Sequence, residues 1–404
     1  MNIRILLYIR YFCLIIFFPF TIIFGFLIKL IRPFFLIRWS QIINTRIGHH
    51  AANLDMYFLE KNEKIFKPKM KYLDIFYKPG LVSANKQIEK MWDKKIFTLP
   101  WFIIHPLEML RKKGFFKEDH AFETTARDKY SLLSISNPIL KFNSDELERG
   151  EKFLKSYGLD SESKFVCLHA RDSAYLNDEK NDYHNFRNSN IETFKLACDF
   201  LASKNIFVFR MGKKVSKKIS FENEKIIDYA NCGNRSDFLD IFLGSRCTFW
   251  LATGSGIDSL AQIFRRPIAF VNQVPIGFIQ TSKKNALVIF KKYFDKIDKK
   301  EISILDLKKK NLAFAHRGDA FVKKNINILD NTEEEILELT KEMVERININ
   351  FWESFLETKR LQEDFWTIFP YDKKIHGNLT THIGKNFLQK NQQLLKKQVS
   401  YNLE

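Results

Sequence analysis

The sequence predicts an α/β protein with parallel sheets, because short apolar strands alternate with helical segments along most of the chain. The clearest unit covers residues 246–272, which read RCTFWLATGSGIDSLAQIFRRPIAFVN. An apolar strand over 247–252 is followed by a turn of small residues, a helix over 257–264 and a buried strand over 268–271. At 404 residues the chain exceeds one typical core, so we expect two domains.

The chain begins with an apolar segment. Residues 11–28 carry no charge and are flanked on both sides by Arg and Lys. Their length just reaches that of a membrane-spanning helix, about 17–25 residues. Pro19 leaves a kinked helix lying in one leaflet as an alternative, and a buried core helix is a third. A signal peptide is disfavoured because no small-residue cleavage site follows, so we expect residues 1–33 to form a membrane anchor segment.

Two Rossmann-like domains are expected after this segment. The first opens with a strand over 34–43, a turn at Gly48 and a helix over 51–59. The boundary is placed by a helix start of the right type at 143–147 and a linker at 160–163. The expected elements are strands at 72–77, 97–104, 165–169, 206–210 and 226–229, and helices at 106–113, 191–204 and 331–346. The expected parts are an N-terminal domain (34–150), a C-terminal domain (151–330), and C-terminal helices with a basic tail (331–404).

Charge and cysteine usage limit the function. The net charge is +18, but the basic residues lie in short clusters without zinc-finger spacing or an RNA-binding aromatic motif. An anionic membrane face or a phosphorylated substrate therefore fits better than nucleic acid. The five cysteines form no CxxC pair, which is typical of a reducing compartment. We expect no metal site.

Four polar clusters lie at the carboxyl ends of the expected strands of the second domain. In a parallel α/β sheet, ligands bind beyond the carboxyl ends of the strands, so clusters at several such ends converge on one edge. Two of these clusters contain arginine, and together they predict an anion pocket. The clusters are His169-Ala170-Arg171-Asp172, Arg210-Met211-Gly212-Lys213, Asp228-Tyr229-Ala230 and Thr253-Gly254-Ser255-Gly256.

Arg171 is the best candidate for a bidentate contact with phosphate, and Lys213 could add charge. In the turn, Gly254 and Gly256 let a ligand approach the backbone, the Thr253 and Ser255 hydroxyls can donate, and the free N–H groups of the helix start favour a diphosphate.

Each of these residues also has a plainer interpretation. The turn can use small residues only because it is tight, and Asp172 can serve only to pair with Arg171. His169 can be a core-edge histidine, and Asp258 can be a helix-dipole partner instead of a ligand for a sugar hydroxyl. Residues 182–188, DYHNFRN, are dense in hydrogen-bonding and aromatic groups, as sugar sites are, but such loops also occur without ligands.

Several stretches resemble a family of bacterial glycosyltransferases with the GT-B fold, in which two Rossmann-like domains face a cleft. The resemblance covers most of residues 35–345 and is carried by LHARDSAYL, RMGKKV, IIDYA, RSDFLDIFLG, TGSGIDSLA and RRPIAFVN. His169-x-Arg171 is also distantly similar to the H-x-R motif of fucosyltransferases, whose arginine binds the nucleotide diphosphate. Those enzymes carry H-x-R-x-x-D or H-x-R-R-x-D, whereas here Asp172 follows Arg171 directly, which argues against fucose as the donor sugar.

The resemblance implies a glycosyltransferase that uses a nucleotide-sugar donor and a surface-glycan or lipid-linked acceptor, at the cytoplasmic face of an inner membrane. Residues 34–150 would then form the acceptor domain and residues 151–330 the nucleotide-sugar domain. No cofactor is expected, and the lack of a clear DxD at a strand end favours catalysis without a metal. The base that deprotonates the acceptor would come from the first domain, where His49 and His50 follow Gly48. A non-catalytic sugar-nucleotide-binding protein and a two-domain sugar-nucleotide epimerase are the alternatives. A dinucleotide oxidoreductase is disfavoured because no G-x-G-x-x-G opens the first helix.

Overall fold

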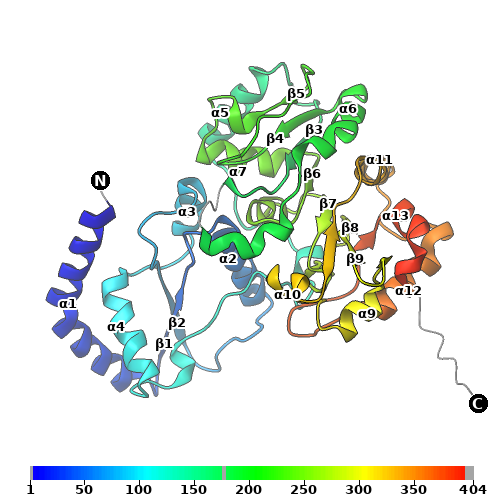
Figure 1. Ribbon diagram of the computed structural model, residues 1–404. Coiled ribbons are helices and arrows are strands. Elements are labelled where there is room, and N and C mark those ends of the chain that lie inside the picture. The colour runs from blue at the N-terminus through cyan, green and yellow to red at the C-terminus, as the bar shows by residue number, and fades with distance from the viewer. Residues whose placement is uncertain (1–2, 175–178, 396–404) are drawn as a thin grey trace, which may run out of the picture. The chain divides into compact units, whose positions relative to one another are not determined.

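The computed structural model describes residues 3–174 and 179–395. The chain folds into two compact units, which are coloured blue to cyan and cyan to red in Figure 1. The N-terminal unit comprises Met1–Arg127 and Pro138–Lys141, and the C-terminal unit comprises Asp128–Asn137 and Phe142–Glu404. Both units are built on parallel strands with helices between them, so the predicted α/β class is confirmed.

The N-terminal unit is organised around two parallel strands that pair along their whole length, from Leu36 opposite Tyr72 to Gln41 opposite Tyr77. Parallel bridges at Ala121 and Thr98 continue the pairing on either side. The elements of this unit are α1 (Ile3–Ile31), β1 (Leu36–Gln41), α2 (Ile47–Asn62), β2 (Tyr72–Tyr77), α3 (Lys86–Asp93) and α4 (Trp101–Lys112).

One predicted strand of this unit is wrong. The apolar run over 97–104 was expected to be a strand, but only Thr98 bridges to β2, and α4 begins at Trp101 directly after Pro100. Proline lacks a backbone N–H and fixes φ, so it is well suited to the start of a helix and poorly suited to the middle of a sheet. The run is apolar because α4 is buried on one side, where Ile104 and Leu107 are fully covered.

The C-terminal unit contains a seven-stranded parallel sheet in the order β12-β8-β7-β6-β3-β4-β5. β4 and then β5 are added on one side of β3. The chain then crosses to the other side of β3, where β6, β7, β8 and β12 are added in turn. The strands are β3 (Phe165–His169), β4 (Phe207–Arg210), β5 (Ile226–Ile227), β6 (Phe249–Ala252), β7 (Ile268–Gln273), β8 (Ala286–Phe290) and β12 (His382–Ile383).

The helices of this unit connect and flank the strands. They are α5 (Ser144–Lys155), α6 (Lys195–Ser203), α7 (Asp237–Arg246), α8 (Ser259–Ile263), α9 (Ile304–Lys309), α10 (Asp319–Val322), α11 (Glu333–Ile349), α12 (Lys359–Ile368) and α13 (Lys385–Lys390). A small antiparallel sheet, β10-β9-β11, is formed by β9 (Lys292–Asp295), β10 (Lys300–Glu301) and β11 (Ile326–Leu329). The reversal of direction between β3 and β6 is a topological switch point, where open α/β sheets bind their ligands.

Candidate functional site

The loops after β3 and β6 meet at the switch point. His169 pairs with Ala252 at the carboxyl ends of these strands. One residue further on, the backbone N–H of Arg171 donates to the Thr253 hydroxyl at 2.8 Å. Because this bond ties the two loops together, two of the four clusters predicted to converge do lie side by side.

Three basic side chains gather at this edge: Arg171 after β3, Arg187 at the end of a 3₁₀ segment (Glu179–Arg187), and Lys291 after β8. We call them the cation cluster. Burial, and then the charge of Arg187, lower the pKa of Arg171 to about 10. Burial also lowers the pKa of Lys291, against the opposing effect of Asp330, and both arginines lower it further. Their mutual repulsion shows that the three cations share one neighbourhood.

The cation cluster holds the loop that covers it. Arg171 donates to the carbonyl oxygen of His184 at 3.2 Å and to the side-chain oxygen of Asn188. Lys291 donates to the carbonyl oxygens of Phe186 at 3.0 Å and Asn188 at 2.6 Å. The loop over residues 184–188 thus supplies several neutral oxygens to two cations.

Carboxylates are scarce at the cation cluster. Lys291 forms an ion pair with Asp330 at 2.7 Å. Within residues 3–174 and 179–395, neither Arg171 nor Arg187 has a carboxylate oxygen within 4.0 Å of a guanidinium nitrogen. The buried Nε of Arg187 has no hydrogen-bond partner in the same part of the chain. A buried cation without a counter-ion is costly, so this site suits an anionic ligand with several oxygens.

The Thr253–Gly256 turn differs from the expectation of free N–H groups. The Ser255 N–H donates to the carboxylate of Asp258, which therefore occupies the position expected for an anion. The helix that follows, α8, has only five residues, so its dipole contributes little. The turn still serves the site through Gly254, whose carbonyl accepts from Arg187 at 2.7 Å.

Gly254 has no room for a side chain. Its φ is +73°, and a Cβ atom at this position would lie 2.4 Å from the side-chain nitrogen of Gln273. The glycine therefore fixes the course of the turn beside the cation cluster.

His169 and Asp258 share the Ser255 hydroxyl. The Nδ1 of His169 lies 3.1 Å from the Ser255 oxygen and 3.9 Å from Asp258. Burial, and then the charge of Arg210, lower the pKa of His169 to about 4, so its ring is neutral at pH 7. Burial raises the pKa of Asp258 to about 7. Asp258 is therefore more than the dipole partner of a helix, since it joins the turn to the end of β3.

The second predicted cluster is occupied with structural contacts. Arg210 is 1% exposed, and it forms an ion pair with Asp228 at 3.0 Å and donates to the carbonyl of Lys217. The Lys213 amine lies 3.8 Å from the carboxylate of Asp237. Gly212, with φ at +156°, lies in the chain between Arg210 and Lys213.

Asp172 does not serve to pair with Arg171. Its carboxylate accepts from the backbone N–H groups of Ala174 at 2.9 Å and Ser216 at 2.8 Å. It therefore fixes the loop after β3 and leaves Arg171 available to a ligand.

The two predicted histidines of the N-terminal unit lie at the start of α2 in different surroundings. His49 is solvent-exposed on one side, and partial burial, followed by the charge of Arg46, lowers its pKa. His50 is fully buried, and burial lowers its pKa to about 4. Neither ring nitrogen of His50 has a hydrogen-bond partner in the described parts of the chain. A substrate can therefore reach His49 but not His50.

Sequence reasoning missed two residues of the cation cluster. Arg187 fell inside the segment 182–188, which was noted for its composition and not for this side chain. Lys291 follows the apolar strand ALVIF, which was not among the predicted strands. The rule that found Arg171, a basic residue directly after a buried strand, would also have found Lys291.

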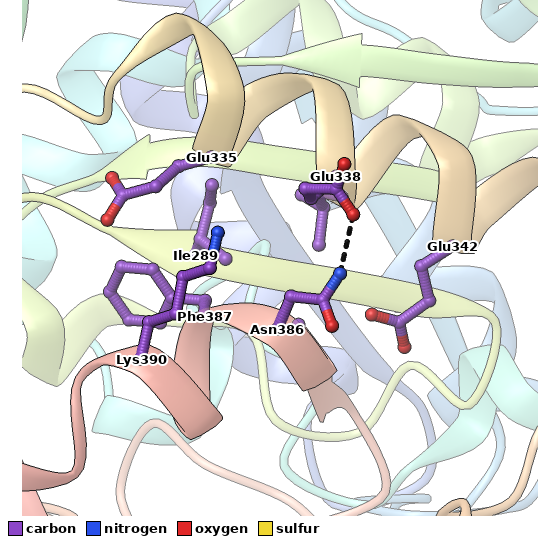
Figure 2. Close-up of a pocket in the computed structure, with 9 residues that line it drawn as sticks. Ile289, Glu335, Glu338, Glu342, Asn386, Phe387 and Lys390 are labelled. Carbon is purple, nitrogen blue, oxygen red and sulfur yellow. Dashed lines mark hydrogen bonds between the residues drawn. The ribbon is translucent and has the colours of Figure 1, made fainter.

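A separate groove lies on the C-terminal unit between α11 and α13. In Figure 2, Glu335, Glu338 and Glu342 lie along α11, and Glu338 is hydrogen-bonded to Asn386 of α13. Each carboxylate has a partner. Glu335 pairs with Lys292 at 3.1 Å, Glu338 accepts from Asn386, and Glu342 pairs with Arg346 at 2.9 Å. The contact with Asn386 connects α11 to α13, and Glu342 also accepts from the backbone N–H of Lys385 at 2.7 Å, so we assign the groove a structural role.

No protein-family model matches the chain, and no curated protein matches its sequence. In fold it is similar to a glycosyl transferase family 9 protein from Veillonella parvula (9% identity, 77% of this chain and 97% of that chain, TM-score 0.42). It is also similar to E. coli ADP-heptose LPS heptosyltransferase II (12% identity, covering 58% of this chain and 84% of that chain, TM-score 0.35). A third similar structure is the iron-containing glycosyltransferase TibC from enterotoxigenic E. coli (12% identity, covering 62% of this chain and 59% of that chain, TM-score 0.32). At these identities and scores the similarities say nothing about substrate or chemistry.

Proposed function

We propose that this protein is a glycosyltransferase that moves a sugar from a nucleotide-sugar donor to an acceptor hydroxyl. The observation that carries the proposal is the cation cluster at the switch point between β3 and β6. Two of its three members have no carboxylate partner in the described parts of the chain, and one of these has an unsatisfied buried Nε. The diphosphate of a nucleotide sugar supplies the charge and the oxygens that these groups lack.

The cluster would act when the bond between sugar and diphosphate breaks. Negative charge then grows on the departing diphosphate, and cations fixed in a partly dehydrated site stabilise that charge more than water does. Arg171 and Arg187 would bind phosphate oxygens, and Lys291 would add a third charge. To admit the donor, Arg171 and Lys291 exchange the loop oxygens that they now hold for phosphate oxygens.

His49 is the proposed base for the acceptor, because its ring is accessible and its lowered pKa keeps it neutral at pH 7. The proposed acceptor is a surface glycan or a lipid-linked glycan, and the proposed location is the cytoplasmic side of an inner membrane. The apolar helix α1 supports the location. The reaction is proposed to need no metal, with the cation cluster in the place of one.

The test is turnover with the purified full-length protein. A panel of UDP-, GDP-, ADP-, CDP- and CMP-sugars is incubated with a membrane extract as acceptor source, and release of free nucleotide is measured. We expect one donor to be consumed, and Arg171→Ala to abolish its use. Lys213→Ala is the matched control, because Lys213 is a basic residue after a neighbouring strand and lies outside the cation cluster. Tight binding of a nucleotide sugar without turnover would favour a non-catalytic binding protein, and no binding by any donor would overturn the proposal.

A further inference from the structure

Helix α1 packs against the N-terminal unit along most of its length. Tyr11 meets Trp101 edge-on with ring centroids 6.3 Å apart, and Phe17 stacks on Phe102 at 5.2 Å. Further along, Gly25 lies so close to Leu107 that an added Cβ would be 3.2 Å from it. The residue pairs advance in the same direction on both helices, so α1 and α4 run parallel, as Figure 1 shows.

The contact is a single stripe along one side of α1. Apart from a gap between Leu14 and Thr21, buried and half-buried residues recur at helical spacing on this side of α1. The last of them, Ile28, is 1% exposed and belongs to the core cluster of the unit. The stripe consists of Leu6, Arg10, Cys13, Leu14, Thr21, Phe24, Gly25 and Ile28.

The charged residues of α1 are also tied to this unit. The Arg10 guanidinium lies 3.8 Å above the Trp101 ring and donates to the carbonyl of Pro79. The Lys29 amine lies 4.3 Å from the Phe115 ring. If α1 crossed a bilayer with these contacts intact, it would carry α4 with it, including the Glu108–Arg111 ion pair. If α1 crossed alone, it would expose the core around Ile28 and break the contacts of Arg10 with Trp101 and Pro79, and both changes are costly.

Apart from Arg4 and Lys29 near the two ends, the rest of the α1 surface is apolar and mostly exposed. The most exposed side chains again recur at helical spacing, on the side away from the stripe, and continue to Phe34 at 83%. From Tyr8 to Leu30 this apolar strip is about 33 Å long, and it is far larger than soluble proteins usually expose. The most exposed side chains are Tyr8 (75%), Phe12 (64%), Ile15 (73%), Phe20 (66%), Ile23 (59%), Phe26 (58%) and Leu30 (73%).

Basic residues lie at the end of this strip. Lys29 is near the C-terminus of α1, and Lys112 and Lys113 are at the end of α4. Phe115 connects the two ends, since Phe26 meets it edge-on at 5.3 Å and Lys29 lies over its ring. Apolar side chains flanked by exposed lysines match a leaflet with an anionic surface, where acyl chains and acidic headgroups are neighbours.

We propose that α1 lies in the plane of the membrane and does not cross it. The stripe stays docked on α4, the opposite side is immersed among the acyl chains of one leaflet, and the lysines contact anionic headgroups. This deepens the membrane location proposed above but does not depend on the reaction. Both ends of α1 must then be on the same side of the membrane as the C-terminal unit.

Cysteine labelling tests the position of the two ends. In full-length protein carrying Cys13→Ser and Cys232→Ser, the three remaining cysteines are buried. Single cysteines are introduced as Arg4→Cys, Lys29→Cys and, as a marker for the C-terminal unit, Lys213→Cys. A membrane-impermeant maleimide is added to intact spheroplasts and to inside-out vesicles. We expect all three positions to label from the same side. Labelling of Arg4→Cys from the side opposite to Lys213→Cys would overturn the proposal.

Vesicle binding tests the immersed side independently. Purified Phe12→Glu/Ile23→Glu protein is sedimented with vesicles of phosphatidylethanolamine and phosphatidylglycerol. We expect at least about tenfold weaker binding than wild type with an unchanged far-UV circular dichroism spectrum, because neither side chain packs on α4. The matched control, Ile297→Glu/Val322→Glu, changes two exposed apolar residues of the C-terminal unit, 71% and 74% exposed, and should bind as wild type does. Unchanged binding by the α1 variant, or an equal loss in the control, would contradict the proposal.

Discussion

The amine of Lys291 donates to the main-chain carbonyl of Asn188 at 2.6 Å, while the side-chain oxygen of the same asparagine accepts from Arg171. One residue of the covering loop thus connects the end of β3 with the end of β8. Neutral oxygens of one asparagine thus link the two cations, and Lys291 also pairs with the carboxylate of Asp330 at 2.7 Å. A site of this kind keeps its positive charge and can exchange loop oxygens for the more strongly attracting oxygens of a phosphate.

Arg171→Ala should weaken the binding of nucleoside diphosphates by about 1.5–3 kcal/mol, the range for a hydrogen bond to a charged group. Isothermal titration calorimetry with UDP, GDP, ADP and CDP measures the loss, and Lys213→Ala should bind as wild type does. Equal affinity of wild type and Arg171→Ala for every nucleotide, with the fold intact, would remove the cation cluster from the donor site.

Lys291→Met should reduce the ligand-induced rise in melting temperature, because the substitution keeps the length of the side chain and removes its charge. Stabilisation by a ligand depends on the ratio of its concentration to its Kd, so a weaker site gives a smaller shift at the same concentration. Lys292→Met is the control at the next position, since Lys292 pairs with Glu335 and not with the covering loop. If the ligand raises the melting temperature of both variants equally, Lys291 does not contact the ligand.

His50 should make the protein less stable in acid. Its folded-state pKa of about 4 lies below the ordinary value of 6.5, so the unfolded chain takes up a proton first as the pH falls. Stability is retained above pH 6.5 and decreases between pH 6.5 and 4, by up to about 3 kcal/mol from this group. Urea unfolding at pH 7.5 and 5.0 measures the change. His50→Leu should lose less stability over this interval than wild type, and an identical pH dependence would show that His50 does not cause it.

Activity should survive EDTA, because the proposed charge complement of the diphosphate consists of side chains. Arg171→Lys should impair turnover although it retains the charge, since a lysine amine cannot reproduce the planar two-pronged contact of a guanidinium. The measurement is donor consumption with and without EDTA, once a donor has been identified. Activity abolished by EDTA and restored by Mg²⁺ or Mn²⁺ would contradict the proposed mechanism.

Much of the C-terminal sheet could be predicted from the sequence. The strands at 165–169, 206–210 and 268–271 are buried on both sides, so they appear as short apolar runs between turn signals. The polar residue after each run then indicated the ligand edge, which is how Arg171 and Thr253 were found. The run at 97–104 is equally apolar, and an apolar run alone does not distinguish a strand from a buried helix face.

The partners of the predicted residues could not be read from the sequence. Arg210 ends a strand and Arg171 lies just beyond one, but only the folded chain shows that Arg210 is paired with Asp228. It also shows that no carboxylate oxygen in the described residues lies within 4.0 Å of the Arg171 guanidinium. The pairing depends on which side chains of distant segments meet. Likewise, an aspartate three residues after Ser255 was visible in the sequence, but whether it caps the turn or leaves the N–H groups free depends on its rotamer.

The stability of the N-terminal unit should depend on α1 through its stripe and not through its exposed side. Ile28→Ala removes a side chain that is 1% exposed within the core of β1, β2 and α4, and such substitutions usually cost about 2–5 kcal/mol. Leu30→Ala is a matched change two residues away on the same helix, at a position that is 73% exposed, and should leave the free energy of unfolding nearly unchanged. Urea unfolding of both variants in the same detergent gives the comparison.

Deleting residues 1–33 removes the whole stripe and should unfold the N-terminal unit at the temperature where wild type is folded. Equal stability of Ile28→Ala and Leu30→Ala would mean that α1 is a detachable anchor, because only a docked helix makes the two positions differ.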